Sequence, residues 1–268
     1  MQHRLSTRAA AVAMASFALG TASAQAATIT GTDRGERLRG TGVVDTISAG
    51  SGSDVLLGLA GDDILDGQDG RDAIWSGPGN DRATGGNGQD VLFGGLGDDN
   101  LSGENGNDRV VGNEGNDTLE LGDGNDRASG GQGNDVVNGG TGNDRIFANA
   151  GADVITGGDG NDDLWAMARV DATTDGNTTV DRLDGGAGND RFHTRDGEAD
   201  LITCGEGKDR ADLDFVDVIT DATPDNPNGS CEKVFRKAPK SKDDGENSSG
   251  DKAPAEPKKL SDAAPLQV

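Results

Sequence analysis

The sequence lacks most of the residues from which a conventional core and a catalytic site are built. Its 268 residues include no tyrosine, two tryptophans and six phenylalanines, and hydrophobic residues reach only 32%. This is too little for a thick core. The two histidines, His3 and His193, belong to no paired-histidine zinc motif, and no Gly-x-Ser-x-Gly nucleophile elbow is present. Since no pair of carboxylates stands out from the acidic background either, we predict that the protein is not an enzyme.

Positive charge is also scarce. Only 24 lysines and arginines oppose 48 aspartates and glutamates, which gives a formal net charge of -24. A protein this acidic repels the phosphates of nucleic acids and the headgroups of anionic lipids. The composition therefore argues against nucleic-acid partners and favours the binding of cations.

Apolar runs are confined to the N-terminus. Two arginines precede an apolar run over residues 9–20, and small residues at Ala22, Ala24 and Ala26 suit a signal peptidase. We predict that residues 1–26 are a signal peptide, whose removal takes the formal charge from -24 to -26; a buried helix is the alternative. No later segment is apolar enough to span a bilayer, so we expect a secreted, extracellular protein without membrane insertion.

Cysteine is limited to Cys204 and Cys231. In the oxidising compartment to which a signal peptide leads, two cysteines indicate one disulfide. Two free thiols are the alternative.

Glycine, by contrast, is abundant and regularly placed. Many of the 45 glycines follow a nine-residue pattern, Gly-Gly-x-Gly-x-Asp-x-U-x, in which U is aliphatic. The pattern runs from residue 49 to 165 and is clearest in residues 85–93, 130–138, 139–147 and 157–165. Registration over this length is typical of repeat proteins. The sixth place holds Asp45, Asp54, Asp63, Asp72, Asp81, Asp90, Asp99, Asp108, Asp117, Asp126, Asp135, Asp144, Asp153 and Asp162.

Residues 31 to about 219 resemble the RTX family, named for repeats in toxins and also known as hemolysin-type calcium-binding repeats. The resemblance rests on the nine-residue units quoted above. It implies an all-β fold, a right-handed parallel β-roll or β-solenoid with two nonapeptide repeats per coil. It also implies that six residues of each unit form a turn that binds calcium, while the other three form a short strand.

The residues themselves support a roll that calcium stabilises. Glycines at places one, two and four allow positive φ and a close approach of neighbouring turns. Every second repeat would then stack at about 4.8 Å, which arranges the aspartates in two columns. Carboxylates about 5 Å apart repel by roughly 1 kcal/mol in water and by several times that inside a protein. Calcium ions with oxygen ligands would remove this repulsion; the capping of turns by aspartate is the alternative.

The pattern breaks after Trp165. Asp181 falls 19 residues after Asp162, one more than a full coil, so we predict either a bulged coil or a loop over residues 166–184, with little or no metal. The pattern returns in two later units, which makes Asp190 and Asp209 further candidate calcium ligands, whereas Asp200 lies one residue out of phase.

These departures suggest a division of the chain into segments. Terminal repeats are expected to be atypical, and the polar C-terminal residues lack apolar periodicity. After the signal peptide we predict degenerate cap repeats over 27–48, the calcium-binding roll over 49–165, a degenerate coil and returning repeat over 166–193, a C-terminal cap with the disulfide over 194–235, and a disordered tail over 236–268.

The ninth place is apolar in every second unit. Because side chains alternate along a strand, place eight should face the core and place nine the outside. We therefore expect an exposed apolar stripe, either a surface for a polysaccharide or cell-surface partner or a face covered by residues 166–235. The stripe consists of Leu57, Trp75, Phe93, Val111, Phe147 and Trp165.

Two functions follow from these features. We predict an extracellular calcium-binding repeat protein that folds on binding calcium and has a structural or binding role. The alternative is a calcium-dependent adhesion or carbohydrate-binding module that uses the apolar stripe.

Overall fold

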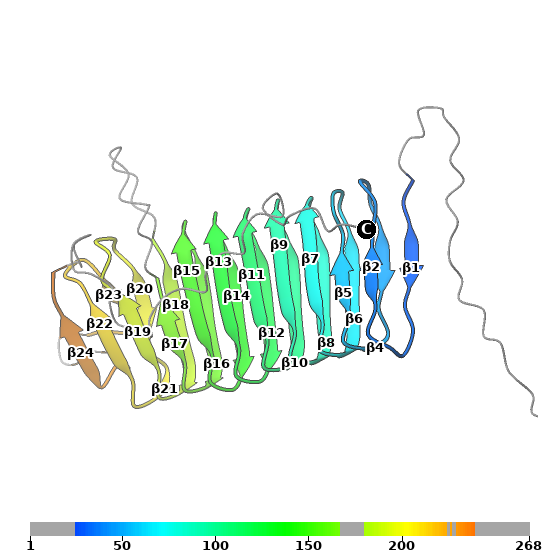
Figure 1. Cartoon of the computed structure of the whole chain (residues 1–268). Coiled ribbons are helices and arrows are strands. Elements are labelled where there is room, and N and C mark those ends of the chain that lie inside the picture. The colour runs from blue at the N-terminus through cyan, green and yellow to red at the C-terminus, as the bar shows by residue number, and fades with distance from the viewer. Residues whose placement is uncertain (1–24, 167–179, 224–225, 227–228, 239–268) are drawn as a thin grey trace, which may run out of the picture.

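Two parallel β-sheets make up the molecule, and the chain passes from one to the other in each coil (Figure 1). The computed structural model describes residues 25–166, 180–223, 226 and 229–238. All regular structure in these residues is β-strand, and none of them form a helix that could cross a membrane. Most of the predicted signal peptide and most of the predicted tail lie outside the described residues.

The first sheet contains the strands that begin the chain and every second strand thereafter. Two short strands, β4 (Ser51–Gly52) and β21 (Glu206–Gly207), pair with β6 and β18 at its margin. Along the stack, its other strands are β1 (Thr28–Thr30), β3 (Thr46–Ser48), β6 (Ile64–Gly70), β8 (Arg82–Gly88), β10 (Asn100–Gly106), β12 (Thr118–Asp123), β14 (Val136–Thr141), β16 (Val154–Gly160), β18 (Arg182–Gly188), β20 (Leu201–Thr203) and β23 (Val218–Ile219).

The second sheet takes the intervening strands in the same order. They are β2 (Arg37–Arg39), β5 (Val55–Leu57), β7 (Ala73–Pro78), β9 (Val91–Leu96), β11 (Arg109–Glu114), β13 (Arg127–Gln132), β15 (Arg145–Ala150), β17 (Asp163–Trp165), β19 (Arg191–Thr194), β22 (Arg210–Leu213) and β24 (Lys233–Arg236).

The strand register confirms the parallel β-roll with two repeats per coil. Leu101 of β10 pairs with Ala83 of β8 on one side and with Leu119 of β12 on the other, an offset of 18 residues each time. The first coils follow the same register, since Thr28 pairs with Thr46. The repeat length of nine therefore sets both the strand pairing and the alternation between sheets.

The core is a single thin layer between the sheets. It consists mainly of the eighth-place side chains, which point inward from each strand as the alternation predicts, and Leu56, Leu92 and Leu101 are fully buried within it. One side chain per half-coil is a small apolar contribution, about 2 kcal/mol for each aliphatic residue. Backbone pairing and the turns must therefore carry much of the organisation of the roll.

The turns require the left-handed backbone region at the second and fourth places. Gly88 shows why the fourth place is glycine, because a Cβ there would overlap the carbonyl oxygen of Gly70 in the turn below. At the second place other residues accept positive φ, for example Gln68 (φ 73°) and Asn113 (φ 82°). The glycines thus permit a backbone-to-backbone packing of turns that side chains would prevent.

The break after Trp165 is a loop between two half-coils rather than an additional coil. Trp165 pairs with His193 and Val154 pairs with Arg182, so the offset rises from 18 to 28 residues on both sheets at this point. Strands on either side of the break remain direct neighbours in the stack. The roll therefore continues in register beyond the ten additional residues.

Candidate calcium sites

Each repeat aspartate is held by the turn that precedes it in the stack. Oδ1 of Asp90 accepts the backbone N–H of Asp72 at 2.7 Å, and the N–H of Asp90 donates to Oδ1 of Asp108 at 2.8 Å. Oδ2 of Asp90 lies beside the Cα of Gly85, the first residue of its own repeat, and accepts no hydrogen bond. The backbone therefore fixes one carboxylate oxygen and leaves the other inside the turn.

This hydrogen bond repeats along the roll and defines two columns of carboxylates. The first-column pairs include Asp45 with Asp63 and Asp135 with Asp153, and the second-column pairs include Asp54 with Asp72. Asp190 and Asp209 extend the second column, where the sequence pattern places them. Nearly all of these carboxylates are at most 3% exposed, which is unusual for so many acidic side chains.

Two aspartates that the sequence leaves out of phase join the first column. The N–H of Asp153 donates to Asp181, that of Asp181 donates to Asp200, and that of Asp200 donates to Asp217. The spacings of 28, 19 and 17 residues differ from 18, yet the stacking is preserved because the surplus and missing residues fall in the connections. The out-of-phase expectation for Asp200 is therefore wrong in space, although it is correct in sequence.

The second oxygen is the buried atom that the protein leaves unsatisfied. Burying a carboxylate oxygen without a partner is costly, and native proteins rarely repeat such a cost. Here the cost recurs at almost every turn, which indicates that a ligand from outside the chain completes the site. The unpartnered Oδ2 atoms belong to Asp54, Asp63, Asp72, Asp81, Asp90, Asp99, Asp108, Asp117, Asp126, Asp135, Asp144, Asp162, Asp190, Asp200 and Asp209.

Burial and crowding raise the pKa of these aspartates. Burial raises the pKa of Asp99 to about 8; the N–H of Asp81 lowers it, whereas the charges of Asp117 and Asp81 raise it further. Asp135 has a pKa of about 8 for the same reasons, with burial as the largest cause. The folded roll therefore disfavours the ionised carboxylates unless positive charge compensates them.

The donor set suits calcium. The turns offer carboxylate and backbone carbonyl oxygens, and a hard cation with six to eight oxygen ligands needs no cysteine or histidine. No three Asp, Glu, His or Cys side chains of the described residues converge closely enough to enclose an ion by themselves. An ion in a turn would thus combine unpartnered carboxylate oxygens with carbonyl groups, and it would supply the charge that the columns lack.

The N-terminal turns satisfy their carboxylates with protein donors instead. Oδ2 of Asp45 accepts both the N–H and the hydroxyl of Thr41, and the N–H of Ala27 donates to Oδ1. The carboxylate of Glu36 accepts the N–H and hydroxyl of Thr32 at 2.8 and 3.0 Å. This matches the sequence expectation that calcium binding is doubtful in the first units.

The disulfide predicted from the sequence is present. Cys204 and Cys231 are joined, and both are buried against the core. The hydroxyl of Ser230 accepts the N–H of Cys204 at 3.0 Å, so the chain on both sides of the bridge is anchored. The bridge ties the segment before β24 to the last full coil.

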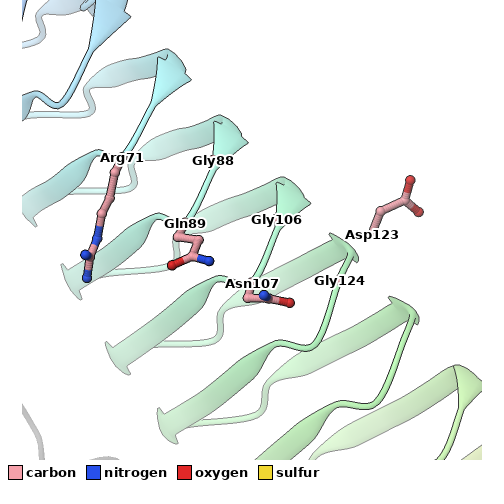
Figure 2. A pocket seen from close by; sticks show the side chains of 7 residues that line it. All are labelled: Arg71, Gly88, Gln89, Gly106, Asn107, Asp123 and Gly124. Atoms are coloured by element: carbon pink, nitrogen blue, oxygen red, sulfur yellow. The ribbon is translucent and has the colours of Figure 1, made fainter.

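The shallow depression that Figure 2 shows lies on the outer rim of consecutive turns. It is formed by the fifth-place residues Arg71, Gln89 and Asn107 with neighbouring glycines, and its one carboxylate is that of Asp123. Its lining contains no histidine, no cysteine and no second carboxylate, so it does not offer a general acid and base.

The apolar stripe is present as a ladder of stacked side chains, but it is buried. The exposed fractions of Leu57, Phe93, Val111, Phe147 and Trp165 are 2–8%, so the expectation of an exposed stripe is wrong for them. Trp75 is half-buried.

Parallel, in-register pairing explains part of this burial. It places each large side chain directly against the next, as the rings of Phe147 and Trp165 show at 4.7 Å. The arginines at place seven also cover the rings, with Arg109 over Phe93 at 5.7 Å and Arg145 over Trp165 at 5.2 Å. A role for this ladder in binding a polysaccharide or a cell-surface partner stays a prediction.

The burial of the ladder predicts that it contributes to stability. We expect Phe147→Ala to lower the free energy of unfolding by about 3–5 kcal/mol, because it removes a buried ring from a stack. Phe215→Ala is the matched control, since Phe215 is 69% exposed and its loss should change stability by less than about 0.5 kcal/mol. Urea unfolding in saturating calcium measures both, and equal effects of the two substitutions would refute the prediction.

Stacked glycine turns around an oxygen-only set of buried ligands define a calcium-binding parallel β-roll. The model of the family described as RTX calcium-binding nonapeptide repeat matches in overlapping copies that together cover residues 30–168 and 175–211. The chain belongs to this family, whose repeats bind Ca²⁺. Comparison with curated proteins found no significant match.

Proposed function

We propose that the protein is an exported, extracellular calcium-binding protein whose roll folds when calcium binds, and that its role is structural rather than catalytic. The observation that carries this proposal is the repeated, fully buried Oδ2 atom without a hydrogen-bond partner. Without cations, folding would bring carboxylates with raised pKa values into two tight columns. With cations, the same columns become ligands.

Export is supported by the N-terminal sequence and is consistent with the disulfide. An oxidising compartment permits the Cys204–Cys231 bridge, and calcium is far more abundant outside cells than in the cytoplasm. Folding after export would follow naturally from this difference. Mass spectrometry of the protein recovered from the culture medium tests the predicted cleavage after residue 26.

Far-ultraviolet circular dichroism of the mature chain during a calcium titration tests calcium-dependent folding. We expect little β structure in chelator, a cooperative gain as calcium is added, and full reversal by EDTA. Magnesium at the same concentrations is the control, because its preference for six ligands in near-ideal octahedral geometry suits carbonyl-rich turns poorly. Full β content in chelator would contradict the proposal.

A calcium-dependent adhesion or carbohydrate-binding role is the alternative that the sequence offers. It depends on an exposed apolar stripe, and most of that stripe is buried. No other feature of the described residues favours this alternative over a structural role. A glycan array probed with and without calcium would separate the two.

A further inference from the structure

Carboxylates gather at the C-terminal end of the first column, where the nonapeptide pattern has ended. The loop after β19 reads Thr-Arg-Asp-Gly-Glu-Ala-Asp over residues 194–200 and replaces the glycine-rich turn of a normal repeat. Asp196, Glu198 and Asp200 alternate along this loop. In a repeat turn only the sixth-place residue provides a carboxylate, so this turn is richer in charged oxygen ligands.

Asp200 provides the observation that points to a ligand. Its exposed fraction is 0%, Oδ1 accepts the N–H of Asp181 at 3.1 Å, and Oδ2 has no hydrogen-bond partner. This is the arrangement found in the repeat turns, although the residue spacing around Asp200 is not that of a repeat. An unpartnered oxygen at such a depth requires compensation.

The charges around Asp200 identify the other members of the cluster. Its pKa is about 9, raised first by burial and then by the charges of Asp196, Asp181 and Asp217. Asp196 is affected in turn by Asp217 and Glu198. The carboxylates therefore lie close enough to repel one another strongly, and a cation among them would convert repulsion into binding.

The surrounding chain holds the loop in place without neutralising these carboxylates. The N–H of Gly197 donates to Asp214, and the N–H of Glu198 donates to Oδ1 of Asp196. Arg236 donates to the carbonyl oxygens of Asp214 and Asp217 at 3.0 Å each, so its guanidinium binds backbone rather than carboxylates. The loop is thus preorganised by the last strands of the roll.

We propose that Asp196, Glu198 and Asp200 bind a divalent cation, with calcium preferred, at a site that the nonapeptide pattern does not define. Three carboxylates and no sulfur or imidazole ligand favour calcium over zinc. Carbonyl oxygens of the loop complete the coordination, since three side chains alone do not converge. The ion fastens the C-terminal cap to the last coils. The inference rests on the proposed function in one respect, that calcium is the ion of the columns.

The test counts bound ions by native mass spectrometry in the mature chain and in the double variant Asp196→Asn with Glu198→Gln. We expect the variant to bind one calcium ion fewer than the wild type and to lose hydrogen-exchange protection in β20, β22 and β23. The matched control is Asp184→Asn with Glu206→Gln, which makes the same two chemical changes at exposed positions near the same end. The control should keep the wild-type count.

The outcomes separate this proposal from the proposed function. A wild type that binds no calcium overturns both, whereas a wild type that folds with calcium and a variant with an identical ion count overturn only the C-terminal site. If the double variant does not fold, Glu198→Gln alone replaces it. We then expect at least a tenfold weaker affinity for the last ion, and unchanged affinity would refute the site.

Discussion

Replacing Asp99 by asparagine is expected to destabilise the roll in calcium and to have the opposite effect in chelator. Asp99 lies in the middle of the first column, is 3% exposed and has an unpartnered Oδ2. In calcium the substitution removes a charged ligand, so we expect one bound ion fewer and at least a tenfold higher calcium midpoint. In chelator it removes a repelled buried charge, so residual β content should rise.

The reason for the change of sign is that the same oxygen has two roles. The amide of asparagine retains an oxygen that can accept the N–H of Asp81, as Oδ1 of Asp99 does at 2.8 Å. The turn can therefore keep its backbone geometry. What it loses is the second, charged oxygen, which repels Asp81 and Asp117 without calcium and binds the ion with it.

Asp98→Asn provides a control one residue away. Asp98 is exposed, and its fifth place is occupied by asparagine in many units, as at Asn80 and Asn116. Its Oδ1 accepts the N–H of Asn116 at 2.7 Å, a contact that asparagine can keep. Calcium titrations followed by circular dichroism should find this variant close to the wild type. An Asp99→Asn midpoint that is equally unchanged would show that Asp99 is not a ligand.

Acidification of the calcium-free chain is expected to increase its β content. The ordinary pKa of these carboxyls is 3.8, and in the folded roll it rises to about 8 for Asp99 and Asp135 and about 7 for Asp108. A group with a raised folded pKa binds protons more readily in the folded state. The stability of the folded state therefore falls as pH rises from about 4 and is lowest above about 8.

Circular dichroism of chain freed of calcium by desalting tests this between pH 5 and pH 9. We expect more β structure at pH 5 than at pH 9, because protons then neutralise the columns as calcium would. In saturating calcium the trend should reverse, since protons compete with the ion for the same oxygens. A β content without calcium that is independent of pH would show that column repulsion does not control folding.

The local order of the roll could be predicted from the sequence because it depends on period. The spacing of nine residues determines which strands pair, and the offset of 18 between Leu101 and Leu119 follows from it directly. The same period puts the eighth-place side chains in the core. These features need no knowledge of distant contacts, since every coil contacts only its neighbours.

The ends of the columns depend on contacts that spacing does not encode. Asp181 and Asp200 stack in the first column although their spacings are 28 and 19 residues, because additional residues can leave the roll as a loop without disturbing the pairing. Sequence phase alone counts those residues and misplaces the aspartates. The alternating carboxylates of residues 196–200 were visible as a pattern, but only the fold brings them near Asp181.

The sequence by itself determined the coil length, the two columns of aspartates and the oxygen-rich chemistry of the turns, because a strict repeat converts residue order into position. Only the tertiary structure decided which carboxylate oxygens are left unpartnered and whether the apolar ladder is exposed. Hydrogen bonding and burial depend on atoms contributed by neighbouring coils. The identity of the residue alone does not contain that information.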